Sequence, residues 1–357
     1  MELSRPDLSK VDPTVREYIE ALEAEVERLQ PKSARPRSRA AVEEEFDASL
    51  GPLEPDEPPT TINVITATAS GIAKRTPRHL YSRQRRGGMG VFDLESPVDE
   101  PPAVLAIADE SDNLLLITNL ARAFRLPVSA ILEKEVREKG ENILTKLNLL
   151  EGEQLAAILP DRAQGYVAMV SERGDVRLLR HHVFGEYMKP GTALYDYKAF
   201  GPLAAACWTP GDGDLFIASR QGRGIRFSEK VVPPQGGPGL RLGNGDVAVG
   251  ITAVYPDGGV FLIGADGKGT IRMMEGFNPN KAPGAGGKIA ITTDNLVAAL
   301  SVEENDEIFI ISKLSKIIRF HASEVPPKEG VVQGVICMSL RADEPVAAAI
   351  SPALSVL

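Results

Sequence analysis

The chain has 357 residues, of which 25% are charged and 5% are aromatic, and its formal net charge is −9. No apolar run reaches the roughly 18 residues that a membrane-spanning helix needs, so an integral membrane protein is excluded. The N-terminal MELSRPDLSK lacks an apolar core, so we expect no secretory signal. Two widely separated cysteines, Cys207 and Cys337, exclude a disulfide framework and a cysteine-based zinc site, and they fit a reducing cytoplasm.

The acidic charge is concentrated at the N-terminal end. Residues 1–60 hold 8 Lys+Arg and 15 Asp+Glu, a net −7, whereas residues 61–357 hold 32 and 34, a net −2. Because the main body is nearly neutral, local clusters of charge decide what it binds.

Residues 12–30 are predicted to form a helix. Asp12 is a plausible N-cap, Pro13 suits the first helical position, and Pro31 ends the run. Apolar residues follow a heptad spacing at Val15, Ile19, Leu22, Val26 and Leu29. This seam predicts either a short coiled coil that makes a homodimer, or a lone amphipathic helix, since so few heptads are marginal in isolation.

Residues 31–60 have the composition of a disordered linker that follows the N-terminal segment (1–11) and the helix. Six prolines occur here, and the charge changes from basic (Lys32, Arg35, Arg37, Arg39) to acidic (Glu43, Glu44, Glu45, Asp47). Such a segment cannot bury enough apolar surface to fold, so we expect an extended chain.

From residue 61 onward, a strand-and-turn phrase that ends in arginine recurs. It reads INVITATASGIAKR, NLLLITNLARAFR, GYVAMVSERGDVRLLR, DLFIASRQGRGIR, GVFLIGADGKGTIR and EIFIISKLSKIIR. The closing residues are Arg75, Arg125, Arg180, Arg226, Arg272 and Arg319. After a Gly/Pro-rich loop, each unit ends in another apolar strand: VLAIAD, AAILP, AAACW, GITAVY, VAALSV or VAAAI.

These six units predict an all-β, six-bladed, propeller-like ring over residues 61–357. The repeats run over about 61–109, 110–160, 161–209, 210–255, 256–304 and 305–352. A single blade cannot bury both of its faces, and a closed ring of blades hides the sheet edges. Small residues such as Ala106, Ala205 and Ala347 fit final strands that crowd around a central axis.

The loop of the first repeat contains Gln84-Arg85-Arg86-Gly87-Gly88-Met89-Gly90, called the box below. It resembles the gyrase A box, Q-(K/R)-R-G-G-(K/R)-G, of the C-terminal domain of bacterial DNA gyrase A, within the repeat family that includes the topoisomerase IV counterpart. The flanking Lys74-Arg75-Thr76-Pro77, the repeat length and the count of six also match. The resemblance implies a β-pinwheel that binds duplex DNA, bends it around its rim and contributes to supercoiling with a type II topoisomerase.

Two departures from the family pattern are visible. Met89 replaces the usual basic residue, so the box has lost one charge. Repeat 4 carries a weakened copy, Pro234-Gln235-Gly236-Gly237-Pro238-Gly239, with glycines but without arginines.

The residues around the box support DNA binding independently of the resemblance. No acidic residue occurs between Glu57 and Asp93, and the six bases in this window are Lys74, Arg75, Arg78, Arg83, Arg85 and Arg86. Glycine permits a close approach of the backbone to phosphate, and arginine suits bidentate phosphate contacts. The alternative is a basic loop that pairs with acidic residues of an adjacent blade.

Later repeats add further bases that we expect to form a track along the rim. The residues expected to contact DNA are Lys74, Arg75, Arg78, Arg83, Gln84, Arg85, Arg86, Gly87, Gly88, Gly90, Arg180, Arg220, Arg223, Arg226, Lys313, Lys316 and Arg319.

Catalytic, cofactor and metal sites are not expected. Gly284-Ala285-Gly286-Gly287-Lys288 is followed by Ile289 and therefore is not a nucleotide-binding P-loop. His181 and His182 are adjacent, so on a strand they face opposite sides and cannot share one metal ion. We therefore expect a non-enzymatic bacterial DNA-binding protein of the cytoplasm and nucleoid. The alternative is a protein-interaction propeller that has lost DNA binding.

Overall fold

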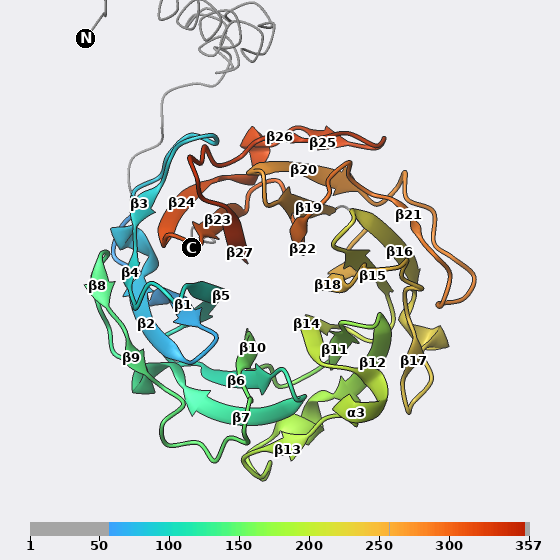
Figure 1. Cartoon of the computed structure of the whole chain (residues 1–357), viewed down its shortest axis with the longest axis horizontal. Helices are drawn as coiled ribbons and strands as arrows, with labels where there is room; N and C mark the ends of the chain where they lie inside the picture. The colour runs from blue at the N-terminus through green and yellow to red at the C-terminus, as the bar shows by residue number, and fades with distance from the viewer. Residues whose placement is uncertain (1–56, 257, 354–357) are drawn as a thin grey trace, which may run out of the picture. The chain divides into compact units, whose positions relative to one another are not determined.

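The computed structural model of the chain describes residues 57–256 and 258–353. These residues form six small antiparallel sheets, and the sheets surround a common centre (Figure 1). The predicted helix at 12–30 and residues 31–56 of the predicted linker lie outside the described residues. The six-bladed, all-β architecture that the repeats predict is confirmed.

Each blade combines three long strands with one short outer strand, except blade 5, which has two short outer strands. Blade 1 holds β1 (Ile62–Thr68), β2 (Ile72–Pro77), β5 (Pro102–Asp109) and β9 (Glu141–Asn142). Blade 2 holds β6 (Asn113–Thr118), β7 (Arg122–Pro127), β10 (Leu155–Pro160) and β13 (Thr192–Ala193). Blade 3 holds β11 (Tyr166–Ser171), β12 (Asp175–Arg180), β14 (Leu203–Thr209) and β17 (Gly237–Pro238).

The second half of the ring repeats this plan. Blade 4 holds β15 (Asp214–Ser219), β16 (Arg223–Ser228), β18 (Ala248–Val254) and β21 (Lys288–Ile289). Blade 5 holds β19 (Gly259–Gly264), β20 (Lys268–Met273), β22 (Leu296–Val302), β25 (Pro327–Lys328) and β26 (Val335–Ile336). Blade 6 holds β23 (Glu307–Ser312), β24 (Lys316–His321), β27 (Pro345–Ser351) and β3 (Val91–Phe92).

Helical structure in the described residues is limited to short turns. The one α-helical turn is α3 (Tyr197–Phe200). Short 3-10 turns follow the second strand of five blades, at Arg78–Leu80, Val128–Ala130, His181–Phe184, Glu229–Val231 and Ala322–Glu324. The pair β4 (Leu94–Glu95) and β8 (Glu138–Lys139) makes a separate parallel ladder.

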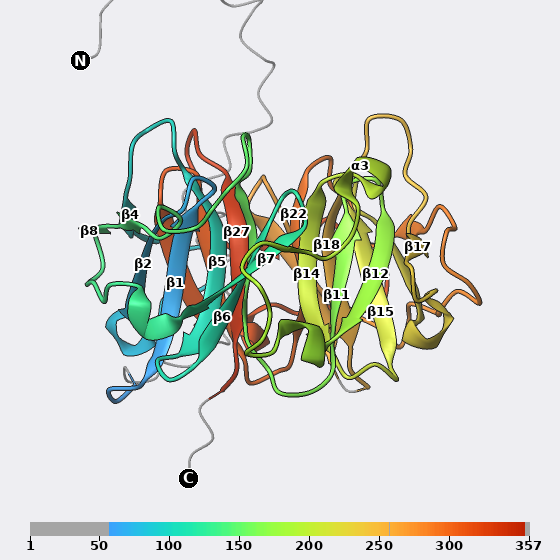
Figure 2. The same cartoon turned by 90° about the horizontal axis from the view of Figure 1, so that it is seen from below.

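The recurring phrase of each repeat forms the central hairpin of a blade, and the final apolar strand lies innermost. In Figure 1, β5, β10, β14, β18, β22 and β27 surround the centre of the ring. Buried alanines on these strands, such as Ala106, Ala298 and Ala347, fit the crowding expected near the axis. The strands run between two faces (Figure 2): the tip face, at the hairpin turns, and the link face, at the connections between blades.

Apolar side chains are buried between neighbouring blades. Six clusters make up the core, and each combines residues from two adjacent blades. One cluster joins Val64 of blade 1 to Phe309 of blade 6, so the first and last repeats pack together like any other pair. Burial at roughly 25 cal/mol per Å² of apolar surface therefore stabilises the ring at every seam.

The outer strand of every blade comes from the next repeat along the chain. Strand β9 of repeat 2 completes blade 1, and β3 of repeat 1 completes blade 6, which closes the ring. After each outer strand, one backbone amide bonds the carbonyl at the neighbouring hairpin tip at 2.7 to 2.9 Å. The donors are Asp93, Ile143, Leu194, Gly239, Ala290 and Cys337, and the acceptors are Ser315, Gly71, Ala121, Gly174, Gly222 and Gly267.

The residue that follows each of these donors is buried. These six buried residues are Leu94, Leu144, Tyr195, Leu240, Ile291 and Met338. Strand exchange therefore fastens each blade to the next by a backbone hydrogen bond and a buried side chain, and Leu94 does so at the closing seam.

Candidate nucleic-acid interface

The box is the segment that leads into the closing strand β3. The backbone amide of Gln84 donates to the backbone carbonyl of Arg319 on blade 6 at 2.8 Å. The Gly87 amide donates to the Cys337 carbonyl at 2.7 Å, and the Gly88 carbonyl accepts from the Ser339 amide at 3.0 Å. Because Cys337 and Ser339 follow the outer strand that repeat 6 contributes to blade 5, the box ties repeat 1 to two separate parts of repeat 6, on blades 6 and 5.

Glycine is required in the box by backbone geometry and by close approach. Gly87 and Gly90 have φ of 81° and 73°, in the left-handed region that disfavours other residues. A Cβ on Gly90 would lie 2.6 Å from the carbonyl oxygen of Ile317. The box glycines therefore let β3 pair closely with β24, and their first role in this fold is ring closure.

The two arginines that give the box its charge are half-buried on the outer side of the ring. The Arg86 amide donates to Glu324 Oε2 at 2.9 Å, and its guanidinium reaches the Ile336 carbonyl at 3.4 Å. Met89, at the position of the missing base, is 58% exposed. The box thus presents Arg85 and Arg86 from a backbone fixed on both sides.

Lys74 was expected to contact DNA, and the structure corrects this. Its side chain is 0% exposed and lies 2.8 Å from Asp93 Oδ1. Asp93 also accepts hydrogen bonds from the hydroxyls of Thr66 and Tyr81, and burial followed by the Asp93 charge raises the pKa of Tyr81 well above its ordinary value. Lys74 Nζ also donates to the Glu135 carbonyl at 2.8 Å, so this lysine holds the outer segment of repeat 2.

Arg75, Arg226 and Arg319 were also expected on the DNA surface, and the structure corrects this too. Each crosses to the next repeat and donates to backbone carbonyls there: Arg75 to Ile131, Arg226 to Met274 and Phe277, and Arg319 to Arg78 and Tyr81. Carboxylates neutralise all three arginines: Glu133 and Glu110 pair with Arg75, Asp214 pairs with Arg226, and Glu307 and Glu57 pair with Arg319. The recurring arginine therefore pins neighbouring blades.

Arg180 and Arg272 do not occupy this pinning position. Arg75, Arg125, Arg226 and Arg319 pair in register with Ile65, Leu115, Phe216 and Phe309. The residue at this place is Leu178 in blade 3 and Ile271 in blade 5. Spacing in the sequence suggested that all six closing arginines are equivalent, whereas strand register places only four of them at the same position of a blade.

Arg78 and Arg83 are likewise held within the protein. Arg78 is buried against Glu57 at 2.9 Å, and Arg83 Nε lies 2.6 Å from Glu307 Oε1. Burial alone would raise the pKa of Glu307, but the hydrogen bond and charge of Arg319, with those of Arg83, lower it below its ordinary value. The alternative of a basic loop paired with acids of an adjacent blade therefore holds for Arg83.

The remaining expected contacts reach solvent. Arg180 is exposed and donates to the Tyr166 hydroxyl at 3.0 Å. Arg220 is exposed at the tip of blade 4, where Arg223 donates to the carbonyls of Gly286 and Gly287. Lys316 lies half-buried at the tip of blade 6, and the neighbouring Lys313 is exposed, 3.5 Å from Glu344.

The weakened copy of the box in repeat 4 is placed differently from the expectation. Gly236 precedes the outer strand β17 as Gly90 precedes β3, so it corresponds to the last residue of the box. The stretch 234–239 is therefore not a second box in register.

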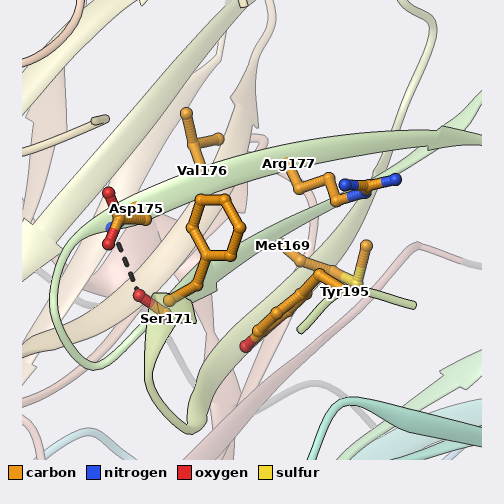
Figure 3. A pocket seen from close by; sticks show the side chains of 7 residues that line it. Met169, Ser171, Asp175, Val176, Arg177 and Tyr195 are labelled. Carbon is orange, nitrogen blue, oxygen red and sulfur yellow. Dashed lines mark hydrogen bonds between the residues drawn. The ribbon is translucent and has the colours of Figure 1, made fainter. Parts of the chain in front are cut away.

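The described residues contain no group of three His, Cys, Asp or Glu side chains that could hold a metal ion. A small pocket between blades 2 and 3 encloses about 10 Å³, enough for one water molecule. Figure 3 shows Tyr195 and Met169 on one side of it and Asp175 next to Ser171 on the other. Burial raises the pKa of the Cys207 and Cys337 thiols to about 12, so neither is a reactive thiolate at neutral pH.

Comparison with known proteins identifies relatives of the ring. The family described as DNA gyrase C-terminal domain, beta-propeller, matches residues 63–95, 112–160, 213–254 and 306–352. The DNA gyrase A protein of Chlamydia pneumoniae is 28% identical over 295 residues, which cover 78% of this chain and 35% of the relative. The DNA gyrase A protein of Escherichia coli K12 is 26% identical over 295 residues, covering 79% and 34%. The chain thus spans about a third of the length of these relatives.

Solved structures match the fold. A DNA gyrase A C-terminal domain superposes with a TM-score of 0.71 at 21% identity, covering 82% of this chain and all of that one. The C-terminal domain of DNA topoisomerase IV gives 0.57 at 17% identity, covering 82% and 93%. No helix in the described residues is long and apolar enough to span a membrane. With its six strand-exchanged blades and the box at the closing seam, the chain is similar to the family of DNA gyrase C-terminal β-propeller domains and shares the fold of these domains.

Proposed function

We propose that this protein binds duplex DNA without sequence specificity and bends it around the rim of the ring. It contributes in this way to DNA topology, either with a type II topoisomerase or as an architectural protein of the bacterial cytoplasm and nucleoid. No catalytic step and no cofactor are assigned to it.

The observation that carries this proposal is the placement of the box. Arg85 and Arg86 are held on the outer side of the seam by a backbone that is bonded to blade 6 and to the outer segment of repeat 6. Arginine makes charge-assisted contacts to phosphate, and a fixed backbone keeps both side chains where a bent duplex would pass. The relatives that the chain matches are gyrase A proteins.

Sequence preference should be slight. The described residues contain no helix longer than the four residues of α3, so no recognition helix is available for the major groove. Contacts to phosphates position a duplex but do not read its bases.

Bending separates this function from simple binding. Smooth bending of a duplex of 20–30 base pairs by 40–90° costs on the order of 1–6 kcal/mol, and contacts made after the bend must offset it. The double variant Arg85→Ala with Arg86→Ala should therefore lose bending more than it loses affinity.

The experiment scores the linking-number change of a circle relaxed by a topoisomerase in the presence of the protein, alongside a gel shift. The wild type should move the topoisomer distribution, and the double variant should retard DNA in the gel yet leave the distribution nearly unmoved. Arg162→Ala with Arg173→Ala, which removes two exposed arginines of repeat 3, is the control. An equal shift by all three proteins would reduce the box to a structural clasp.

A protein-interaction propeller is the second candidate. It is favoured by the four bases of the window that are held inside the protein, Lys74, Arg75, Arg78 and Arg83, and by the exposed apolar Met89. Gel shifts on random-sequence duplex across a salt series separate the candidates, because this alternative gives no retardation at any salt concentration.

A further inference from the structure

The outer segments of the six repeats differ in length, and the long ones are neighbours in the ring. Each segment runs from the residue that closes the turn after the second strand to the glycine before the outer strand. Eight residues lie between these points in repeats 1, 2 and 6, nine in repeat 5, but only five in repeat 3 and three in repeat 4. By strand exchange, the four long segments lie on blades 4, 5, 6 and 1 in unbroken succession.

Backbone bonds join these long segments head to tail. The carbonyl of Gly88 in the box accepts from Ser339 of repeat 6 at 3.0 Å, and that of Val332 in repeat 6 accepts from Thr292 of repeat 5 at 2.9 Å. Repeat 2 joins the residues after the box through the parallel pairing of β8 with β4. We call residues 278–286, 326–333, 82–89 and 132–139 the belt.

The box conformation recurs within the belt. Gly284 of repeat 5 has a φ of 85°, and its amide bonds the Gly239 carbonyl at 2.7 Å, as Gly87 bonds Cys337. Arg137 of repeat 2 stands at the same place with a φ of 71°, which is costly for a residue other than glycine. The chain therefore follows one path in several repeats whose sequences differ from the box.

The belt concentrates positive charge. It holds eight basic and four acidic residues, whereas residues 61–357 as a whole are net negative. One of the four acids, Glu133, is committed to Arg75, and another, Glu138, accepts the Glu135 amide. On the link face, the described connections between blades carry seven acidic residues and one basic residue.

Several belt bases are exposed and have no structural task. The side chains of Arg137, Lys281 and Lys328 make no hydrogen bond or ion pair to any described residue. A base that pins no neighbouring blade is available to an external anion, in contrast to Lys74 and Arg75.

We infer that the belt is the DNA path: the phosphates of a duplex run along blades 4, 5, 6 and 1, two-thirds of the ring, and leave blades 2 and 3 free. This inference rests on the proposed function and specifies its surface. Arg137, Lys281 and Lys328 join the box arginines as phosphate contacts, and the contact ends where the short segments of repeats 3 and 4 begin.

The test compares two matched charge reversals in the whole chain. Lys281→Glu with Lys328→Glu alters the belt. Lys189→Glu with Lys230→Glu alters the outer segment of repeat 3 and the short turn that precedes the outer segment of repeat 4. All four lysines are exposed, and both pairs change the net charge equally. Affinity for a duplex long enough to span the ring is measured by fluorescence anisotropy between about 50 and 200 mM KCl, and thermal melting checks that both variants fold.

The belt pair should weaken binding about tenfold or more and flatten the slope of log K against log salt by about 2, one contact per lysine. The control pair should change affinity less than about twofold, because its lysines lie away from the duplex. Equal losses from the two pairs would overturn the belt while leaving DNA binding in place. A wild-type chain that binds no duplex would instead remove the proposed function itself.

The variant Arg137→Gly is a second test of the DNA path, and it should leave folding intact. Glycine suits the φ of 71°, so the variant should melt at the same or a higher temperature while it binds DNA more weakly. Unchanged affinity would exclude Arg137 from the path.

Discussion

Replacing Gly90 by alanine should loosen the closing seam of the ring far more than the same change at Gly152. Both glycines have a φ of 73°. A Cβ on Gly90 would lie 2.6 Å from the Ile317 oxygen, whereas nothing lies within 4 Å of a Cβ on Gly152. The pair therefore separates the cost of close approach from the cost of the left-handed conformation.

The expected magnitudes follow from these contacts. Alanine in the left-handed region costs roughly 1–2 kcal/mol, and both variants pay this. The contact at Gly90 also forces β3 away from β24 and draws Leu94, which is fully buried, out of its site. Partial loss of one buried leucine adds roughly 2–3 kcal/mol to the Gly90 variant alone.

Urea unfolding gives the two free energies, and hydrogen exchange locates the change. The Gly90 variant should lose protection at the amides of β3 and β24, while the Gly152 variant keeps it. If the two variants lose equal stability and equal protection, the close approach of β3 to β24 does not explain the last glycine of the box.

Three further outcomes are expected. Arg272→Leu should raise the free energy of unfolding by about 1–2 kcal/mol in urea titrations, because Arg272 is 6% exposed and its Nε and Nη1 have no hydrogen-bond partner. The equivalent strand positions in blades 4 and 6 hold the apolar residues Phe227 and Phe320. The lowered pKa of Glu307 adds stability that is present above the ordinary glutamate pKa and is lost as pH falls through the lowered value; the urea midpoint of Glu307→Gln should therefore depend less on pH in that window. Removing residues 1–56, which are acidic overall, should tighten DNA binding in anisotropy titrations, and light scattering of the same two chains shows whether these residues make a dimer.

The ring could be predicted from sequence because its signal is repeated. Six copies of a hairpin phrase and six small-residue strands fix the number of blades and the innermost position of β5, β10 and their equivalents. Strand exchange could not be predicted in this way. An outer strand such as β3 or β9 has two residues, too few to show an alternating pattern, and it acquires its place only when the preceding blade offers a tip carbonyl.

The charged window shows where sequence reasoning about the site went wrong. Six bases without an intervening acid looked like a free basic surface, but four of them, Lys74, Arg75, Arg78 and Arg83, are neutralised by acids that lie outside the window. Glu57 and Asp93 flank it directly, and Glu307 is 224 residues from Arg83 along the chain. Only the closed ring brings these acids to the bases, so a local charge count overestimates the exposed charge.

The position of the box makes ring closure and DNA binding interdependent. Its glycines and backbone amides hold blade 1 against blade 6, and its arginines project from the same few residues. A duplex that bridges the seam by contacting belt segments on both sides would bind the closed ring more tightly than an opened one, and a ligand that prefers the closed state stabilises it. The wild-type ring should therefore unfold at a higher urea concentration when DNA is bound. The Gly90→Ala variant should regain part of its lost stability on adding DNA, by an amount that grows with DNA concentration, whereas a ring whose box only clasps the blades would gain nothing.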